Sequence, residues 1–286
     1  MRGIILAGGS GTRLHPLTIA VSKQLLPVYN KPMVYYPLST LILAGARQIM
    51  IITSPRDVSS FRDLLGDGSD LGIELLYKIQ DEPRGIAEGL LLSADFADGE
   101  PTALILGDNI FYGAGVGETL ETYSKKEGAT ILVQSVTDPE RYGVIELRSD
   151  GSVKSLAEKP PAPKSNLAIT GLYFLDGTAA ERAKLLKPSD RGELEIVDVL
   201  NSYLHDGLLE ARVLPRGTAW LDTGTFDSMS MASEFVRVVE QRQGFKISAP
   251  EEIAFRLGLI DSEQLIKLAE KYSKSDYGVY LRSLIG

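Results

Sequence analysis

The stretch that decides the fold is Arg2-Gly3-Ile4-Ile5-Leu6-Ala7-Gly8-Gly9-Ser10-Gly11-Thr12-Arg13-Leu14, an apolar run that passes directly into a glycine-rich loop. The apolar run predicts a buried strand. The glycines allow backbone N–H groups to approach a phosphate, and Arg13 can add charge-assisted hydrogen bonds. A plain tight turn explains the same glycines. Leu14 stands where a dinucleotide-binding fingerprint needs its third glycine, and no P-loop lysine follows, so neither of these phosphate loops matches.

The composition indicates a globular protein of enzyme size and excludes several functions. The 286 residues are 44% hydrophobic, enough for a substantial core. A net charge of −8 argues against a nucleic-acid polymer as partner. The absence of cysteine excludes disulfides and thiolate chemistry, and the two histidines, His15 and His205, are too far apart in the sequence to suggest a metal site. No apolar stretch reaches about 18 residues and no signal peptide is recognisable, so we expect a cytoplasmic protein without a membrane partner.

Residues 1–128 predict strands that alternate with helices. Apolar runs indicate further strands at 48–53, 73–77 and 102–106, with helices at 33–44, 58–65 and 85–94. Such alternation is typical of a parallel sheet covered on both faces. Ligands of these sheets bind beyond the carboxyl ends of the strands, where the glycine-rich loop and Asp108 both fall.

The remaining sequence predicts a partly antiparallel region and then helices. Short strands are expected at 130–135, 143–147, 152–157 and 168–175, followed by a helix at 193–204 and by strands at 209–214 and 219–221 that complete the sheet. Helices at 226–243, 262–272 and 276–284 end the chain. The predicted fold class is α/β, with a mixed, mostly parallel sheet flanked by helices, a smaller antiparallel part and a helical C-terminal extension.

Two aspartates stand at strand ends, where hard cations are often bound. Asp108 follows the strand at 102–106, and Asp222 follows Ala219-Trp220-Leu221. Two such carboxylates, together with water and phosphate oxygens, suit Mg²⁺. The competing interpretation is that each aspartate caps the turn or helix behind it, which Asp222-Thr223-Gly224-Thr225 would also suit.

Several further residues are candidates for binding phosphate, base or sugar. Arg13 and Lys23 place positive charge near the glycines of an otherwise acidic protein, and Lys159 can grip a phosphate while Glu158 accepts sugar hydroxyls. A surface ion pair is the simpler explanation for Glu158 and Lys159. The loop with Gln80, Pro83 and Gly85 suits a flat base as well as a simple turn. We expect Trp220 to pack in the core, and stacking on a sugar or a base is the less favoured interpretation.

Ordered motifs along nearly the whole chain resemble those of the sugar nucleotidyltransferases. Besides the N-terminal stretch, they are Ser22-Lys23-Gln24-Leu25-Leu26-Pro27, Leu106-Gly107-Asp108-Asn109, Asp138-Pro139-Glu140-Arg141-Tyr142-Gly143, Glu158-Lys159-Pro160, Arg191-Gly192-Glu193-Leu194-Glu195 and Ala219-Trp220-Leu221-Asp222-Thr223-Gly224-Thr225. The resemblance implies one Rossmann-like nucleotidyltransferase domain over 1–286, with a nucleotide-binding part at 1–128, a sugar-phosphate-binding part at 129–225 and the extension at 226–286.

The resemblance implies transfer of a thymidylyl group from dTTP to glucose 1-phosphate, giving dTDP-glucose and pyrophosphate, with Mg²⁺ held by Asp108 and Asp222. It implies that five residues act in catalysis: Arg13, Lys23, Asp108, Lys159 and Asp222. The implied nucleotide site is Leu6, Gly8, Gly9, Gly11, Thr12, Arg13, Gln24, Gln80, Pro83, Gly85 and Asp108. The implied sugar-phosphate site is Asn109, Tyr142, Gly143, Glu158, Lys159, Trp220 and Asp222.

The resemblance also implies a homotetramer that performs the first step of dTDP-L-rhamnose biosynthesis. Inhibition by dTDP-L-rhamnose is implied at a separate site with Arg216, Glu252 and Arg256. The alternatives are transfer from UTP in place of dTTP and a catalytically silent, nucleotide-binding regulatory protein. A silent protein has no need of both carboxylates and all three cations, which favours the enzyme.

Overall fold

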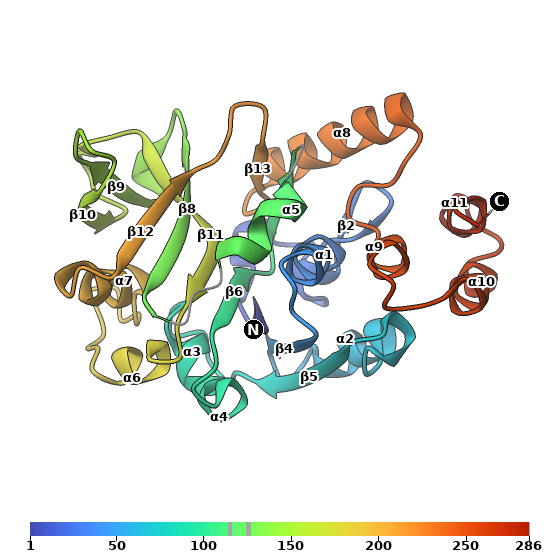
Figure 1. Ribbon diagram of the computed structural model, residues 1–286, viewed down its shortest axis with the longest axis horizontal. Coiled ribbons are helices and arrows are strands. Elements are labelled where there is room, and N and C mark those ends of the chain that lie inside the picture. Colours follow the sequence, from blue (N-terminus) through green and yellow to red (C-terminus); the bar gives the residue numbers. More distant parts are fainter. Residues whose placement is uncertain (114–115, 124–126, 286) are drawn as a thin grey trace.

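A nine-stranded sheet forms the centre of the computed structural model, which describes residues 1–113, 116–123 and 127–285 (Figure 1). Its parallel half has the order β6-β1-β4-β5, as the alternation of strands and helices predicts. The strands of this half are β1 (Arg2–Ala7), β4 (Gln48–Thr53), β5 (Glu74–Ile79) and β6 (Thr102–Leu106).

The other half of the sheet is mainly antiparallel and is joined to the first through a single strand. Strand β11 (Leu167–Leu175) runs antiparallel to β6, β8 and β9, whereas β12 pairs in parallel with β8. The predicted antiparallel region is therefore confirmed. Its other strands are β8 (Ala129–Ser135), β9 (Gly143–Leu147), β10 (Val153–Glu158) and β12 (Leu209–Val213).

The strand at the end of this region lies outside the large sheet. Strand β13 (Ala219–Asp222), predicted to complete the sheet, instead pairs with β7 (Asn109–Tyr112) in a separate two-stranded ribbon. Strand β7 directly follows Asp108 and offers β13 a free edge. A second small ribbon pairs β2 (Pro27–Val28) with β3 (Lys31–Pro32).

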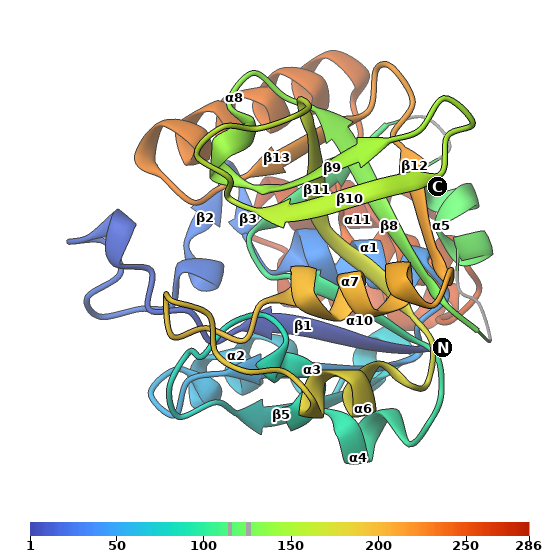
Figure 2. The ribbon, with the colours of Figure 1, turned by 90° about the vertical axis from the view of Figure 1, so that its left-hand side faces the viewer.

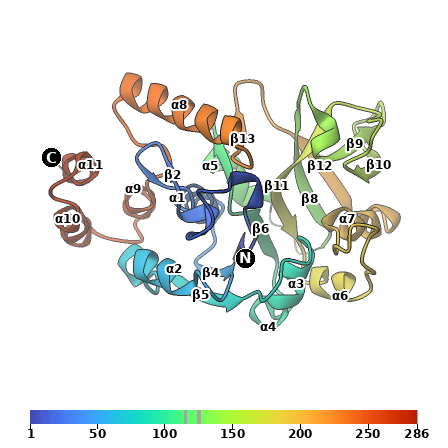
Figure 3. The same cartoon turned by 180° about the vertical axis from the view of Figure 1, so that it is seen from behind.

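Helices cover both faces of the sheet, and the C-terminal helices gather at one end of the molecule, opposite β9 and β10 (Figures 1 and 3). The helices are α1 (Tyr35–Leu43), α2 (Val58–Leu65), α3 (Glu88–Leu92), α4 (Ala94–Ala97), α5 (Val116–Leu120), α6 (Ala179–Lys184), α7 (Ile196–His205), α8 (Phe226–Gln243), α9 (Pro250–Arg256), α10 (Ser262–Lys271) and α11 (Asp276–Ser283). None among the described residues is long and apolar enough to cross a bilayer.

Two predicted helices begin later than expected because their first residues pair with each other. Leu194 N donates to Arg84 O at 2.7 Å, and Ala87 N donates to Leu194 O at 3.1 Å. These bonds hold both segments extended, so α3 begins at Glu88 and α7 at Ile196. Gly85 has a φ of +105°, which a glycine adopts without strain.

The core is divided by the sheet into two main layers, with a smaller third cluster below α8. One layer packs α1, α9 and α10 against one face, around Leu38, Leu41 and Leu265. The other packs α3 and α7 against the opposite face, around Leu90 and Leu200. Close packing on both faces fixes the strand ends, from which the candidate site is built.

Candidate active site

The β7–β13 ribbon brings the two predicted metal carboxylates together. Asp108 immediately precedes β7, and Asp222 is the last residue of β13, opposite Asn109 in the register. Thr223 strengthens the junction, because its Oγ1 donates to the backbone carbonyl of Asp108 at 2.8 Å. Residues that are more than a hundred positions apart in the sequence thus meet at one end of a short ribbon.

A cavity of about 150 Å³ opens beside these carboxylates. All seven residues of the predicted sugar-phosphate site line it, together with Arg13 and Asp108 from the predicted nucleotide site. Arg13 reaches across from the glycine-rich loop, and its Nη2 lies 3.1 Å from the point that a Cβ on Gly224 would occupy. The structure therefore brings all five predicted catalytic residues into one neighbourhood, with Lys23 attached through its ion pair with Asp108.

The wall of the cavity is organised by the Asn109 amide. Its Oδ1 accepts hydrogen bonds from Trp220 Nε1 at 2.5 Å and from Gly171 N at 3.2 Å. A Cβ on residue 171 would lie 2.6 Å from this oxygen, which explains the glycine there. Trp220 is half-buried, and its ring lies edge-on to Tyr142 with centroids 5.1 Å apart. It therefore packs partly against the core, as predicted, and also lines the cavity.

Glu158 and Lys159 lie at the end of β10 with a third charged residue, Arg191. The Lys159 Nζ is 3.6 Å and the Arg191 Nη2 is 3.5 Å from Glu158 Oε1. Burial nevertheless raises the pKa of Glu158, and the two cations only partly oppose this shift. Arg191 also binds Glu195 at 2.8 Å, which orients its guanidinium. Arg191 stands within one of the motifs but is not among the predicted site residues.

Both predicted metal carboxylates are held by cations of the chain. Lys23 pairs with Asp108 Oδ2, and Asn109 Nδ2 donates to its Oδ1 at 2.9 Å. Burial acts to raise the pKa of Asp108, but the lysine ammonium and the amide outweigh it and lower that pKa. Asp222 Oδ2 accepts from Arg141 Nη2 at 3.2 Å and from Tyr142 Oη at 3.0 Å.

The capping interpretation of Asp222 is partly correct. Its Oδ1 accepts from Gly224 N at 2.8 Å and from Ser228 Oγ at 3.2 Å. The N-cap of α8 itself is Thr225, which forms a capping box with Ser228. One oxygen of Asp222 therefore supports the start of α8 while the other faces the charged groups of the cavity.

A second cavity, of about 440 Å³, lies along the glycine-rich loop and includes Gly8, Gly9, Thr12 and Pro83 of the predicted nucleotide site. Figure 2 shows the segment after β1, in dark blue, projecting from the body of the molecule. Arg56, which is not among the predicted site residues, adds a cation to this cavity and pairs with Asp57 at 3.1 Å. Arg56 follows the carboxyl end of β4, and ligands of parallel sheets bind beyond such strand ends. This position in the sequence could have identified it as a candidate site residue.

The remaining predicted nucleotide residues form the frame around this loop. Gln80 is buried against Gly8, where a Cβ would lie 2.1 Å from the Gln80 Oε1, and its Nε2 donates to Glu88 at 2.6 Å. Gln24 is buried and accepts from Ser22 Oγ at 2.6 Å. Gly11 has a φ of +62° and accepts a hydrogen bond from Thr18 at 2.7 Å. Leu6 is half-buried near the end of β1.

Two of the three residues predicted for an inhibitor site are joined by a hydrogen bond. On α9, Arg256 Nε donates to Glu252 Oε1 at 2.7 Å, and Tyr280 also binds Glu252. Arg216 lies in the connection between β12 and β13. Within the described ranges, no hydrogen bond or ion pair joins Arg216 to the other two, so the inhibitor site stays a prediction.

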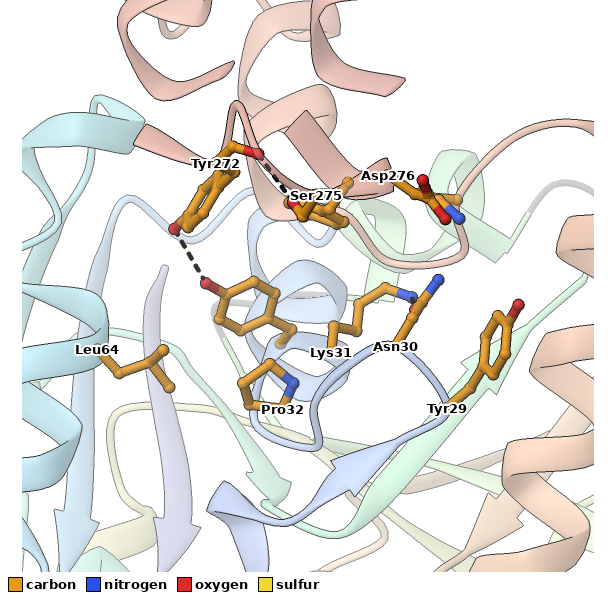
Figure 4. Close-up of a pocket in the computed structure, with 11 residues that line it drawn as sticks. Tyr29, Asn30, Lys31, Pro32, Leu64, Tyr272, Ser275 and Asp276 are labelled. Carbon is orange, nitrogen blue, oxygen red and sulfur yellow. Dashed lines mark hydrogen bonds between the residues drawn. The ribbon is translucent and has the colours of Figure 1, made fainter. Parts of the chain in front are cut away.

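A larger cavity, of about 460 Å³, lies between the β2–β3 hairpin and the C-terminal helices and contains none of the predicted site residues (Figure 4). Tyr35 and Tyr272 form part of its wall, and Lys31 enters from the hairpin. The Lys31 ammonium is already paired with Glu240 at 2.7 Å, and both side chains are almost fully buried. This charge pair connects the hairpin to α8.

The described residues contain no group of three or more histidine, cysteine or acidic side chains that would hold a metal by themselves. What the site offers is a pair of carboxylates, a glycine-rich loop at the carboxyl end of β1 and several lysines and arginines. Such an arrangement is typical of enzymes that act on phosphorylated substrates.

The comparisons with known proteins identify that class of enzyme. Residues 2–238 match the family described as "Nucleotidyl transferase", and the chain belongs to this family. It is 58% identical to a glucose-1-phosphate thymidylyltransferase of Mycolicibacterium smegmatis, over 100% of this chain and 99% of the relative. An enzyme of the same name from Xanthomonas campestris is 54% identical, over 99% of this chain and 96% of the relative. The chain is thus a nucleotidyltransferase, as its motifs predict.

Solved structures show the same fold. The crystal structure of a putative glucose-1-phosphate thymidylyltransferase from Bacillus anthracis, in complex with a sucrose, matches with a TM-score of 0.77 and 41% identity. The match covers 83% of this chain and 95% of that one. A UDP-glucose pyrophosphorylase complexed with UDP-glucose matches with a TM-score of 0.73 and 24% identity, over 83% of this chain and 98% of that one. The predicted α/β nucleotidyltransferase fold is confirmed.

Proposed function

We propose that this enzyme transfers a thymidylyl group from dTTP to glucose 1-phosphate and releases dTDP-glucose and pyrophosphate. The observation that carries the proposal is the cavity beside Asp108 and Asp222, which gathers the whole predicted sugar-phosphate site next to the glycine-rich loop. The curated relatives named for this reaction, which align over the full chain, support the choice of substrates.

The reaction requires no covalent intermediate on the protein. A phosphate oxygen of glucose 1-phosphate attacks the α-phosphorus of dTTP, the new P–O bond forms, and the bond to the leaving pyrophosphate breaks. The attacking oxygen is already anionic at neutral pH, so no general base is needed. The enzyme's task is to bring two anions into line and to stabilise the charge that develops between them.

The chain's own cations perform this task. Arg13 and Lys23 neutralise the triphosphate, and Lys159 holds the phosphate of the sugar. Glu158 and the Asn109 amide bind sugar hydroxyls, while Trp220 and Tyr142 shape the wall around the ring. Asp108 and Asp222 would hold Mg²⁺, because a pair of carboxylates with phosphate oxygens and water is a donor set that this ion prefers. When bound, the ion supplies Lewis-acid stabilisation of the phosphoryl oxygens.

The identity of the base is tested by comparing nucleoside triphosphates. Gln80, held by Glu88 against Gly8, presents an amide that suits a pyrimidine edge. We expect kcat/KM with dTTP to exceed that with UTP when pyrophosphate release is followed with glucose 1-phosphate and Mg²⁺. Clearly faster turnover with UTP would replace the proposal with uridylyl transfer, and no turnover with any triphosphate would contradict it altogether.

Replacing Lys159 by Ala should mainly weaken binding of glucose 1-phosphate. The ammonium is exposed to the cavity, and its ion pair with Glu158 is long, at 3.6 Å, so little folding stability depends on it. Loss of one charge-assisted contact predicts a rise in KM for the sugar phosphate of about 10- to 100-fold, from roughly 1.5–3 kcal/mol. Steady-state kinetics with dTTP held saturating measure this effect, and an unchanged KM would remove Lys159 from the site.

The pathway, the oligomeric state and the regulation of the enzyme are further parts of the proposal. We propose that dTDP-glucose made here feeds dTDP-L-rhamnose synthesis, that the enzyme is a homotetramer, and that dTDP-L-rhamnose inhibits it through Arg216, Glu252 and Arg256. Arg216 lies in the connection between β12 and β13 and the other two residues lie on α9, so such a site would draw on two segments of the chain.

A further inference from the structure

Two cations of the chain lie on the same oxygens that a metal would use. Lys23 Nζ contacts Asp108 Oδ2, and Arg141 Nη2 lies 3.2 Å from Asp222 Oδ2. The first pair is sheltered, with exposed side-chain fractions of 12% for Lys23 and 18% for Asp108, whereas in the second pair Asp222 is 16% and Arg141 is 36% exposed. A charged donor this close to a carboxylate oxygen competes directly with a divalent cation for it, because like charges repel strongly at such distances.

The other carboxylate oxygens are committed to neutral donors. Asp108 Oδ1 accepts from the Asn109 amide, and Asp222 Oδ1 accepts from Gly224 N and Ser228 Oγ. These donors keep both carboxylates oriented whichever cation is bound. Only the Oδ2 side of each aspartate is therefore available for an exchange of partners.

We propose that Lys23 and Arg141 are placeholders for the metal, which leave Asp108 and Asp222 when substrate phosphates arrive to accept them. The proposal rests on the proposed function for the metal and the phosphorylated substrates. Asp108 and Asp222 would then hold a divalent cation, while the released ammonium and guanidinium would bind phosphate oxygens. Every charge keeps an opposite partner before and after the exchange.

Arg141 is suited to such an exchange by its anchoring. Its Nη1 is fixed on Asp138 at 2.6 Å, and its guanidinium carbon lies 5.2 Å from the centre of the Tyr142 ring. With one edge held, the other edge can turn from Asp222 into the cavity, which also contains Lys159. A guanidinium there can bind phosphate with two parallel hydrogen bonds, so Arg141 becomes a further phosphate-binding residue.

The consequence is that metal and nucleotide bind cooperatively. A metal that arrives alone leaves the sheltered Lys23 ammonium without its carboxylate and takes one of the two carboxylate partners of Arg141, which keeps Asp138. A nucleotide that draws both cations away before a metal arrives leaves two carboxylates without these cations. Each ligand removes the cost that opposes the other. Coupling of this kind between two ligands is typically about 1–3 kcal/mol, or roughly 5- to 150-fold in affinity.

The test measures Mn²⁺ binding to the full-length protein without nucleotide, by calorimetry and by electron paramagnetic resonance of free Mn²⁺. In Lys23→Met and in Arg141→Met, the displaced cation is gone, so each variant should bind Mn²⁺ about 5- to 150-fold more tightly than the wild type. Lys159→Met is the matched control, because Lys159 is a cation of the same cavity that pairs with Glu158 and not with either aspartate. Its Mn²⁺ affinity should equal that of the wild type.

A second experiment measures the coupling between nucleotide binding and Mn²⁺ binding. A dTTP analogue with a non-hydrolysable α–β bridge should strengthen Mn²⁺ binding more in the wild type than in the two variants. Unchanged or weaker Mn²⁺ binding in both variants, with circular dichroism showing that they are folded, would overturn the proposal. This outcome is distinct from failure of the proposed function, since Mn²⁺ binding without nucleotide does not depend on which triphosphate the enzyme uses.

Discussion

Asp108→Asn is expected to lower kcat by about 10²- to 10³-fold, the loss that follows removal of one electrostatic stabilising group from an active site. The substitution keeps the shape of the side chain and its acceptor for the Asn109 amide, but it removes the charge that faces Lys23 and the proposed metal. Steady-state pyrophosphate release with saturating dTTP, glucose 1-phosphate and Mg²⁺ measures the effect.

The control for this variant is Asp227→Asn. Asp227 is an exposed carboxylate in the first turn of α8, five residues beyond Asp222, and lines neither cavity of the candidate site. We expect it to retain full activity. Turnover of Asp108→Asn within about two-fold of the wild type would exclude Asp108 from metal binding, provided that both proteins show the same circular dichroism.

Glu240→Gln is expected to destabilise the fold by about 3–5 kcal/mol, the usual effect of removing one partner of a buried ion pair. Glu240 accepts hydrogen bonds from Asn30, Lys246 and the backbone of residue 247 in addition to Lys31, and its side chain is only 2% exposed. Without its charge, the Lys31 ammonium is left buried and unpaired. Urea unfolding followed by circular dichroism gives the change in the free energy of unfolding.

The effect of pH supplies an independent check. Burial lowers the pKa of Lys31, and Glu240 opposes this shift, so the pKa should fall further in Glu240→Gln. A lysine whose folded pKa lies below its unfolded value destabilises the fold while protonated, and stability rises as pH increases through the folded pKa. The difference between variant and wild type should therefore shrink as the pH rises toward the unfolded pKa of lysine, about 10.4.

Two further variants serve as controls for the loss of stability in Glu240→Gln. Glu234→Gln breaks an exposed ion pair with Arg237 on the same helix and should change the unfolding free energy by less than about 0.5 kcal/mol. The double variant Lys31→Met, Glu240→Gln removes both charges but keeps an acceptor for Asn30 and the backbone of residue 247, and it should recover most of the lost stability. A loss for Glu240→Gln no larger than that for Glu234→Gln would show that the buried pair contributes little.

Much of the fold was predictable because its signals are local. The strands at 48–53 and 102–106 and the helices at 58–65 and 226–243 match the structure, since the apolar pattern lies within each segment and glycines lie near its ends. The position of β13 was not predictable in this way. Its partner, β7, is only four residues long, and a run that short has no periodicity that favours the ribbon over the sheet.

The site residues that belong to recognisable motifs could be predicted from the sequence. Charged residues that pair across long sequence separations were harder to predict. The seven sugar-phosphate residues share one cavity, although their roles remain predictions. Arg141 and Arg191 were quoted only as parts of motifs, because an arginine beside acidic residues is usually a surface ion pair. Lys31 and Glu240 are separated by 209 positions, and charged residues are so rarely buried that the sequence gives no reason to pair them.

The single connection through β11 separates two kinds of recognition. The cavity beside the glycine-rich loop and the cavity beside β9 and β10 share no lining residue, and they adjoin at Thr12, which lines the first, and Arg13, which lines the second. Under the proposed function, the choice of base and the choice of sugar therefore depend on different side chains. Substitutions in one cavity can therefore change the specificity for one substrate without altering the residues that bind the other. Asp108 and Asp222, at the β7–β13 ribbon, would stay the same.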